Sequence, residues 1–295
     1  MHPYSPEGLY ATPPGIDALR RGLGSQQIFR AMCVKCDEQH NLYVDLGEET
    51  GIIPREEAAL GIREGTIKDY AILSRVGKPV SFLVTDFPGD GTVRLSRRAA
   101  QLDARSYYLN TLIPGDIVEG CVVSTAEFGL FCDLGSGFTA LMPTCRCCVS
   151  RLRSSAERYV PGQRICAAVL EIQEELGRIV LTGREVPGTW EENIQGFRQG
   201  QTVPGIVRSK MPYGVFVELT PNLSGLAEPT DGVQVGDSVS VFLRAILPEK
   251  HKIKLNILEK LPAPLPPAEP EFFVTSGHLD SWRYSPGSSA VTYFR

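Results

Sequence analysis

The sequence predicts an all-β protein with three tandem five-stranded barrels, joined by short helices and followed by a proline-rich C-terminal tail. Two observations lead to this prediction. One pattern of short β-type runs occurs three times along the chain. The 29 glycines and 22 prolines supply the turns that separate such runs, and 295 residues suffice for two or three domains.

The repeat is clearest between the second and third units. The second unit reads PGDIVEGCVV from Pro114 and EFGLFCDLGSGFTALMP over 127–143. The third reads GQTVPGIV over 200–207 and PYGVFVELTPNLSGLAE over 212–228, and a more divergent first unit reads QHNLYVDLGEETGIIP over 39–54. Each unit has about five short runs rich in β-branched and aromatic residues between turn residues, which is typical of a small barrel.

The joins between the units have helical patterns. Leu102, Leu109 and Leu112 lie near helical spacing in the first join. In the second join, Thr189 and Glu192 form a capping box. Apolar residues then follow at i, i+4 and i+7: Trp190, Ile194 and Phe197. We therefore expect a short helix in each join.

These patterns predict the domain boundaries. The segment LPAPLPPAEPE after Glu259 indicates an extended spacer, and the aromatic residues beyond it show no clear period. We expect an N-terminal extension over 1–25, barrels over 26–98, 114–185 and 200–260, helical linkers over 99–113 and 186–199, and a spacer with tail over 261–295.

An aromatic residue is expected on the solvent-facing side of one strand in every unit. In LFCDL over 130–134, strict alternation places Phe131 opposite the residues that face the core. The same alternation places Phe216 and Tyr43 on the outer face of the third and first units. An acidic residue follows two positions later on the same side: Asp133, Glu218 and Asp45.

Two of these rings are expected to have an aromatic neighbour. Gly129 and Gly214 allow a close turn, so that Phe128 and Tyr213 can lie beside the outward-facing rings. Paired rings on a barrel surface suit single-stranded nucleic acid, because every base can stack on an aromatic face. The alternative is that the rings cover a barrel edge or pack on a neighbouring unit.

These motifs carry a family resemblance. The order Gly-x-x-Val-x-Gly-x-Val, Phe-Gly-x-Phe-x-Asp-Leu-Gly, Gly-Leu, Gly-x-x-Val and Arg-Ile-x-Leu-Ser resembles the S1 RNA-binding domain, an OB-type barrel. The similarity covers about residues 26 to 260. LSRRAAQ (95–101), GTWEEN (188–193) and ILPEKHKIKL (246–255) make the whole chain similar to the short, three-domain forms of bacterial ribosomal protein S1.

The resemblance implies a set of RNA-binding residues in the second unit. The family binds single-stranded RNA through two aromatic residues, a histidine, an aspartate and a basic residue. It implies that Phe128 and Phe131 stack on bases and that Arg178 contacts phosphate. Pro143 stands at the histidine position, and Gln173 lies near the aspartate position.

The resemblance implies smaller sets in the other two units. In the third unit it implies Tyr213, Phe216 and Lys252, with Glu228 at the histidine position. In the first unit it implies Tyr43, with His40 at the outer aromatic position. The histidine, aspartate and basic positions of the first unit hold Pro54, Asp86 and Thr92.

Charge predicts weak, salt-sensitive binding by each barrel. The net charge is −4, and none of the three units is basic overall. Local clusters of Lys and Arg side chains could still contact an RNA backbone. Such clusters are more often simply a solvent-exposed surface. Arg208 and Lys210 lie on one strand, and one loop holds Arg151, Arg153 and Arg158. Linking several weak domains would strengthen the binding.

Other classes of function are disfavoured. The chain has no apolar run long enough for a membrane span and no secretory signal at its start, which predicts a cytoplasmic protein with reduced cysteines. CVKC at Cys33 and CRCC at Cys145 could be imagined as a zinc site, but ordinary thiols are favoured, and we expect no cofactor or metal. Phosphate-binding, hydrolase and metalloprotease motifs are absent from the sequence, which predicts no enzymatic activity.

Two functional hypotheses remain. The first is a non-catalytic protein that binds single-stranded RNA or mRNA in translation, with the 30S ribosomal subunit as a possible partner. The second is a protein-interaction adaptor whose barrels contact the ribosome or another protein. Barrels of this type host both behaviours, so the fold does not choose between them.

Overall fold

The computed structural model describes residues 3–8, 12–266 and 271–294. The chain divides into two compact units. The first unit comprises Met1–Leu112, Cys132–Ala140 and Glu174–Arg178, and the second comprises Ile113–Phe131, Leu141–Gln173 and Ile179–Arg295. Within the described residues, the helices are all too short or too polar to cross a lipid bilayer.

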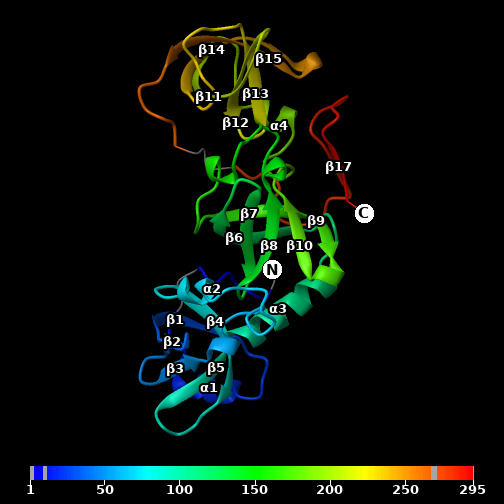
Figure 1. Ribbon diagram of the computed structural model, residues 1–295. Coiled ribbons are helices and arrows are strands. Elements are labelled where there is room, and N and C mark those ends of the chain that lie inside the picture. Colours follow the sequence, from blue (N-terminus) through cyan, green and yellow to red (C-terminus); the bar gives the residue numbers. More distant parts are fainter. Residues whose placement is uncertain (1–2, 9–11, 267–270, 295) are drawn as a thin grey trace. The chain divides into compact units, whose positions relative to one another are not determined.

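The described residues form three closed barrels of five strands each (Figure 1). The first contains β1 (Phe29–Cys36), β2 (Leu42–Asp45), β3 (Thr50–Ile53), β4 (Pro79–Asp86) and β5 (Thr92–Ser96). The second contains β6 (Ile117–Thr125), β7 (Gly129–Gly135), β8 (Phe138–Pro143), β9 (Arg164–Gln173) and β10 (Arg178–Thr182). The third contains β11 (Thr202–Met211), β12 (Gly214–Thr220), β13 (Leu223–Ala227), β14 (Ser238–Leu247) and β15 (Lys252–Lys260).

The three barrels share one topology. In each, the strands follow around the barrel in the order first, second, third, fifth, fourth. The third and fifth strands pair in parallel, and this pairing helps to close every barrel. The predicted all-β class and the three tandem barrels are therefore confirmed.

The barrel cores follow the alternation of the strands. In β7, Leu130 and Leu134 are buried, and in β12 Val215 and Val217 are fully buried. Because successive side chains point to opposite faces, the residues between them lie on the outer surface of the barrel. The second strand of each barrel therefore presents its aromatic residue outward.

Short helices accompany the barrels. The α-helices are α1 (Ile16–Gly22), α2 (Tyr70–Leu73), α3 (Arg97–Thr111) and α4 (Trp190–Ile194). Single 3₁₀ turns are η1 (Arg55–Glu57), η2 (Thr144–Arg146), η3 (Ser155–Glu157), η4 (Glu174–Leu176) and η5 (Pro248–Lys250).

Helix α3 forms in the first join, as expected. Its buried residues include Ala100, Ala104 and Tyr108, whereas Leu102 and Leu109 are only partly buried. The helix lies against β4, and small residues on the contacting face let the helix backbone approach the strand closely. The leucine spacing thus predicted the helix correctly, and of the three leucines only Leu112, at the C-cap, is buried.

Helix α4 has the expected capping box. The Thr189 hydroxyl accepts from the Glu192 amide, and the Glu192 carboxylate accepts from the Thr189 amide. Trp190 is buried in the core cluster of the third barrel, against which Ile194 and Phe197 pack. The apolar residues at helical spacing in this join therefore pack against the core of the third barrel.

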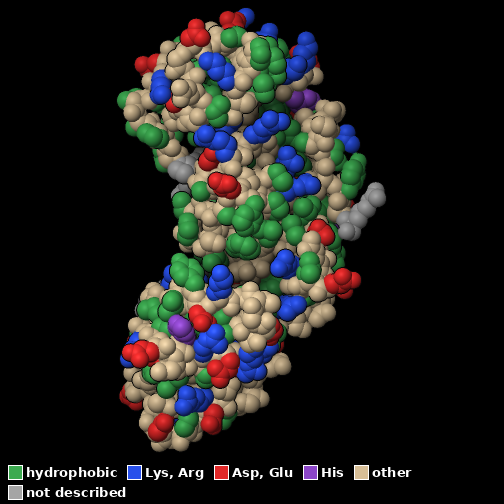
Figure 2. Space-filling view, in the orientation of Figure 1, with side chains coloured by type: hydrophobic (Ala, Val, Ile, Leu, Met, Phe, Trp, Pro, Cys, Tyr) green, Lys and Arg blue, Asp and Glu red, His purple; other side chains and the backbone are tan. Residues whose placement is uncertain are grey.

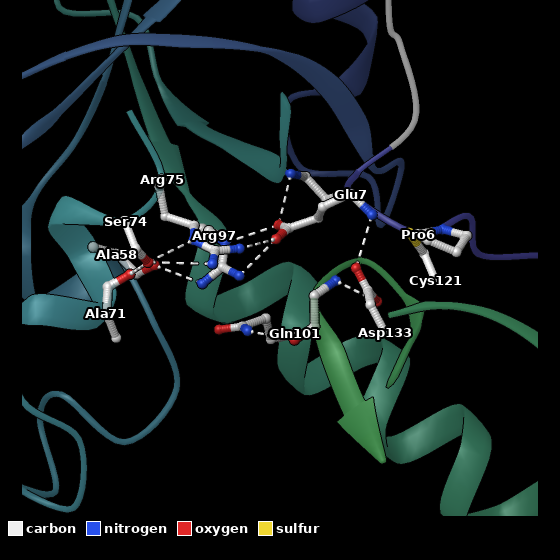
Figure 3. A network of polar contacts seen from close by, with 12 residues as sticks. Pro6, Glu7, Ala58, Ala71, Ser74, Arg75, Arg97, Gln101, Cys121 and Asp133 are labelled. Atoms are coloured by element: carbon white, nitrogen blue, oxygen red, sulfur yellow. Dashed lines mark hydrogen bonds and ion pairs between the residues drawn. The ribbon is translucent and has the colours of Figure 1, made fainter. Parts of the chain in front are cut away.

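The N-terminal extension supplies a buried carboxylate to the first unit (Figure 3). Arg97 donates from Nε and Nη2 to the two Glu7 oxygens, over 2.8 and 2.7 Å. The Glu7 amide donates to Asp133 Oδ2 over 2.8 Å. Burial and the neighbouring Glu7 charge raise the pKa of Asp133. Asp133 was expected to face solvent beside Phe131, and this expectation is wrong because Glu7 covers it.

The C-terminal tail is part of the second unit and packs against strands of the second barrel. It forms a two-stranded sheet from β16 (Ser281–Arg283) and β17 (Val291–Tyr293). Trp282 and Phe294 join a buried cluster with Ile117, Cys166 and Val186. Residues 267–270 of the expected proline-rich spacer lie outside the described residues.

Candidate nucleic-acid interface

The second barrel presents a pair of phenylalanine rings to solvent. Phe128 is 63% exposed and Phe131 is 36% exposed. Their ring centroids lie 6.1 Å apart, and the ring planes meet at 78°. Perpendicular rings leave a face of each ring open, so that neighbouring bases could stack on different rings.

The hairpin that carries Phe128 is held by hydrogen bonds. The Thr144 amide donates to the Phe128 carbonyl over 3.0 Å, and the Thr144 hydroxyl donates to the Glu127 carbonyl over 2.7 Å. The buried Ser155 hydroxyl accepts from the Ala126 amide and lies 2.9 Å from the Gly129 carbonyl. The ring therefore extends from a loop whose backbone is fixed on both sides.

Gly129 allows the two rings to lie side by side. A Cβ atom at this position would lie 2.5 Å from the Met142 carbonyl oxygen in β8. Gly214 meets the same restriction in the third barrel, where a Cβ atom would lie 2.5 Å from the Ala227 carbonyl oxygen. In both barrels the glycine between the rings is required because the neighbouring strand passes so close.

We expect Gly129→Ala to destabilise the second unit, because the added Cβ must displace β8. A forced shift of this kind costs about 1–3 kcal/mol. The measurement is urea unfolding followed by tryptophan fluorescence, since both tryptophans, Trp190 and Trp282, belong to this unit. Gly196→Ala is the matched control, because a Cβ atom at Gly196 meets nothing within 4 Å. Equal stability of the two variants would contradict the expectation.

The third barrel carries the corresponding pair. Tyr213 is 65% exposed, and its ring centroid lies 6.3 Å from that of Phe216, with the planes at 89°. Lys210 is exposed on β11 and donates to the Thr230 carbonyl over 3.0 Å. Glu228, at the position of the family's histidine, pairs with Arg244 over 2.8 Å. The positive charge of the Arg244 guanidinium thus offsets the Glu228 carboxylate.

The first barrel lacks a comparable open pair. The Tyr43 hydroxyl donates to Asp37 over 3.2 Å, and Lys35 lies 5.3 Å from the centre of the Tyr43 ring. His40 Nδ1 lies 3.6 Å from Asp69. The hydrogen bonds from Asn41 and Tyr43 lower the pKa of Asp37 by more than burial raises it. This carboxylate is therefore ionised at neutral pH. The Tyr43 hydroxyl and the His40 ring therefore lie beside carboxylates, and RNA contact by these two residues stays a prediction.

The predicted basic residues differ in accessibility. Arg178 and Lys252 are exposed, each at the first residue of its strand, β10 and β15. Arg208 is different, since its guanidinium donates to Glu218 over 2.8 Å and to Glu157 over 2.6 Å. Its side chain is only 7% exposed. RNA contact by Arg178, Lys210 and Lys252 stays a prediction, whereas Arg208 is engaged in ion pairs.

A buried ion-pair network joins the second and third barrels within the second unit. Arg158 donates from Nη2 to Glu218 over 2.7 Å, and both side chains are almost fully buried. Burial raises the pKa of Glu218, but Arg158 and Arg208 outweigh burial and hold it below its ordinary value. The sequence placed Glu218 on the outer face correctly and in solvent wrongly, because the segment before β9 covers it.

A polar side chain strengthens the same junction. Asn222 Oδ1 accepts from the Val149 amide over 3.0 Å. Asn222 Nδ2 donates to the Arg184 and Gly188 carbonyls over 2.7 and 2.8 Å. Sequence reasoning missed these residues, and their only signal was the Pro-Asn turn, which predicts a loop and not a contact.

Six of the eight cysteines are buried thiols, whereas Cys36 is half-buried and Cys145 is exposed. Cys33 belongs to the core cluster of the first barrel, and burial raises its pKa to about 11. Burial raises the pKa of Cys147 to about 12. Across the described residues, no three His, Cys, Asp or Glu side chains gather as metal ligands would. High pKa values keep these thiols protonated at neutral pH.

Known proteins share this sequence pattern. The S1 RNA binding domain matches residues 111–184. The small ribosomal subunit protein bS1 of Streptococcus pneumoniae is 32% identical over 187 residues, which cover 57% of this chain and 46% of that protein. The bS1 protein of Leuconostoc lactis is 28% identical over 239 residues, which cover 75% of this chain and 54% of that protein.

A solved structure was also matched. It is a multidomain protein with nucleic acid binding domains from Streptococcus pneumoniae, 14% identical, covering 81% of this chain and 75% of that chain with a TM-score of 0.26. The chain spans about half the length of the bS1 relatives named above. The comparisons lead to one conclusion: residues 111–184 match the S1 RNA binding domain, and the chain resembles ribosomal protein bS1.

Proposed function

We propose that this protein binds single-stranded RNA through the exposed ring pairs of its second and third barrels. The observation that carries the proposal is the repetition of one geometry. Phe128 with Phe131, and Tyr213 with the half-buried Phe216, lie at the same place on two barrels with nearly perpendicular ring planes. Stacking on such rings contributes about 1–3 kcal/mol per base without strict sequence demand.

The relatives support a role in translation. Their printed names place them in the small ribosomal subunit, and the matching domain is named for RNA binding. We propose that the chain holds mRNA near the 30S subunit in the cytoplasm, as a binding protein and not as an enzyme. Two linked barrels would bind one strand more tightly than either alone, because the second contact becomes intramolecular.

The first barrel favours a second role for part of the chain. Its equivalent ring, Tyr43, is bonded to Asp37, and His40 lies beside Asp69. Acidic side chains at this face disfavour phosphate. We propose that the first barrel contacts protein, for example on the ribosome, while the second and third barrels contact RNA.

The test is an anisotropy titration of a labelled 12-nucleotide oligouridine at several salt concentrations. Each phosphate contact on a single strand changes the logarithm of affinity with a slope of about −0.7 against the logarithm of salt. Three contacts would therefore weaken binding roughly 20-fold between 50 and 200 mM salt. Absence of binding at low salt would overturn the proposal and favour the adaptor role for all three barrels.

A further inference from the structure

A groove of about 410 Å³ lies in the second unit, where the segment after β8 meets β11 and β12. We call it the inter-barrel groove. Its volume is within the range of about 300–1,000 Å³ that holds small organic ligands. Both barrels, the linker helix α4 and the C-terminal tail contribute to its walls, through Ser150, Arg151, Trp190, Tyr213, Phe216 and Tyr284.

The groove carries an excess of positive charge. Behind it the charges are balanced: Arg208 bonds to Glu157, and Arg158 and Arg208 bond to Glu218. Arg151 adds a further charge at the groove. It is exposed and makes no hydrogen bond or ion pair with any residue that the structure describes. Figure 2 shows Lys and Arg side chains gathered where the third barrel meets the second.

The walls combine rings with hydroxyl groups. Phe216 and Tyr284 give an aromatic lining, and the nearly buried Trp190 lies behind it. The Ser150 and Ser224 hydroxyls lie 3.2 Å apart at the same groove. This is the composition that suits a nucleotide, whose base needs an apolar or aromatic wall and whose ribose and phosphate need polar partners.

The groove is preformed. The Tyr284 hydroxyl donates to the Asn222 carbonyl over 2.5 Å, and the Trp190 amide donates to the Tyr284 carbonyl over 3.0 Å. The Ser150 amide donates to the Pro221 carbonyl over 3.2 Å. Because these bonds fix the walls before any ligand arrives, little conformational entropy is lost on binding.

We propose that an RNA strand stacked on Tyr213 and Phe216 continues into the inter-barrel groove. One nucleotide places its base against the aromatic wall, and its phosphate meets Arg151. This inference rests on the proposed RNA-binding function and extends it from separate barrel faces to a composite site. The second barrel thereby contributes to binding in two ways. Phe128 and Phe131 stack on bases, and Ser150 and Arg151 line the groove beside the third barrel.

The test compares two arginines of one loop. Arg151→Ala removes the free charge at the groove, and Arg153→Ala removes a charge that is paired with Glu157 and does not line the groove. Anisotropy titrations with the 12-nucleotide oligouridine should show that Arg151→Ala reduces the salt slope by about 0.7 and weakens binding about five-fold at 0.1 M salt. Arg153→Ala should leave both values close to those of the unchanged protein.

A second readout comes from Trp190, which lines the groove. In a Trp282→Phe background Trp190 is the sole tryptophan, since the chain has 2. RNA should quench its emission, and the quenching should require higher RNA concentrations in the Arg151→Ala variant.

The outcomes separate the two proposals. If the protein binds RNA and loses affinity when the rings are removed, but Arg151→Ala binds normally and Trp190 emission does not change, the composite site is wrong and the proposed function stands. If the unchanged protein does not bind the oligouridine at all, the proposed function fails and the composite site fails with it.

Discussion

Replacing Phe128 and Phe131 together with alanine should weaken RNA binding at least about 30-fold, since two stacked bases at about 1 kcal/mol or more each are lost. The barrel should stay folded, because both rings are exposed and the core beneath them is formed by Leu130 and its neighbours. Anisotropy titration measures the affinity, and the urea midpoint from tryptophan fluorescence measures the fold.

The matched control removes exposed apolar side chains from elsewhere in the same barrel region. Ile113 and Val160 are 55% and 53% exposed. Their double alanine variant should bind RNA as the unchanged protein does. Phe131→Tyr should also retain binding, because it keeps a ring in the same place. Normal affinity in the Phe128/Phe131 variant would show that the rings are not the RNA surface, and an unfolded variant would show that they are part of the core.

Replacing Glu218 with alanine should lower the free energy of unfolding of the second unit by about 3–5 kcal/mol. The variant leaves Arg158 buried without its carboxylate partner, and Arg208 loses one of its two partners. Urea unfolding followed by tryptophan fluorescence reports on this unit. Glu119→Ala is the control, because Glu119 pairs with Arg164 at the exposed surface and such a pair contributes at most about 1 kcal/mol.

A compensating variant distinguishes charge burial from loss of packing. Arg158→Met with Glu218→Leu removes both charges, leaves Arg208 paired with Glu157, and should recover most of the lost stability. If Glu218→Ala is no more damaging than Glu119→Ala, the network does not hold the two barrels together.

The same network predicts a pH dependence. The pKa of Glu218 is lower in the folded protein than in the unfolded chain, because Arg158 and Arg208 outweigh the effect of burial. The contribution of Glu218 to stability is therefore present above the ordinary glutamate pKa and is lost as the pH falls toward the folded value. The urea midpoint of the unchanged protein should fall with acidification more steeply than that of the Arg158→Met, Glu218→Leu variant.

The repeat of β-type runs was enough to predict the barrels, because strand alternation and turn residues are local properties of a sequence. Alternation also placed Phe131 and Phe216 on the outer face, since a period of two leaves no other choice once the leucines and valines are buried. Their partners Phe128 and Tyr213 could be placed as well, because a glycine between the rings marks the close passage of the next strand.

Alternation says which way a side chain points, but not what covers it. Asp133 and Glu218 point outward as predicted, yet both are buried, because Glu7 reaches the first from the N-terminal segment and Arg158 reaches the second from the preceding barrel. Partners separated by 126 and 60 residues leave no periodic signal in the chain.

The structure of the C-terminal tail could not be predicted from local periodicity either. Its strands are three residues each, too short to display a period, and Trp282 and Phe294 are buried only because Ile117, Cys166 and Val186 offer them a surface. The inter-barrel groove likewise exists only once the barrels, α4 and the tail are assembled. Local periodicity thus defined the barrels and their outward rings, whereas long-range packing and charge pairing defined which polar residues stay available to bind.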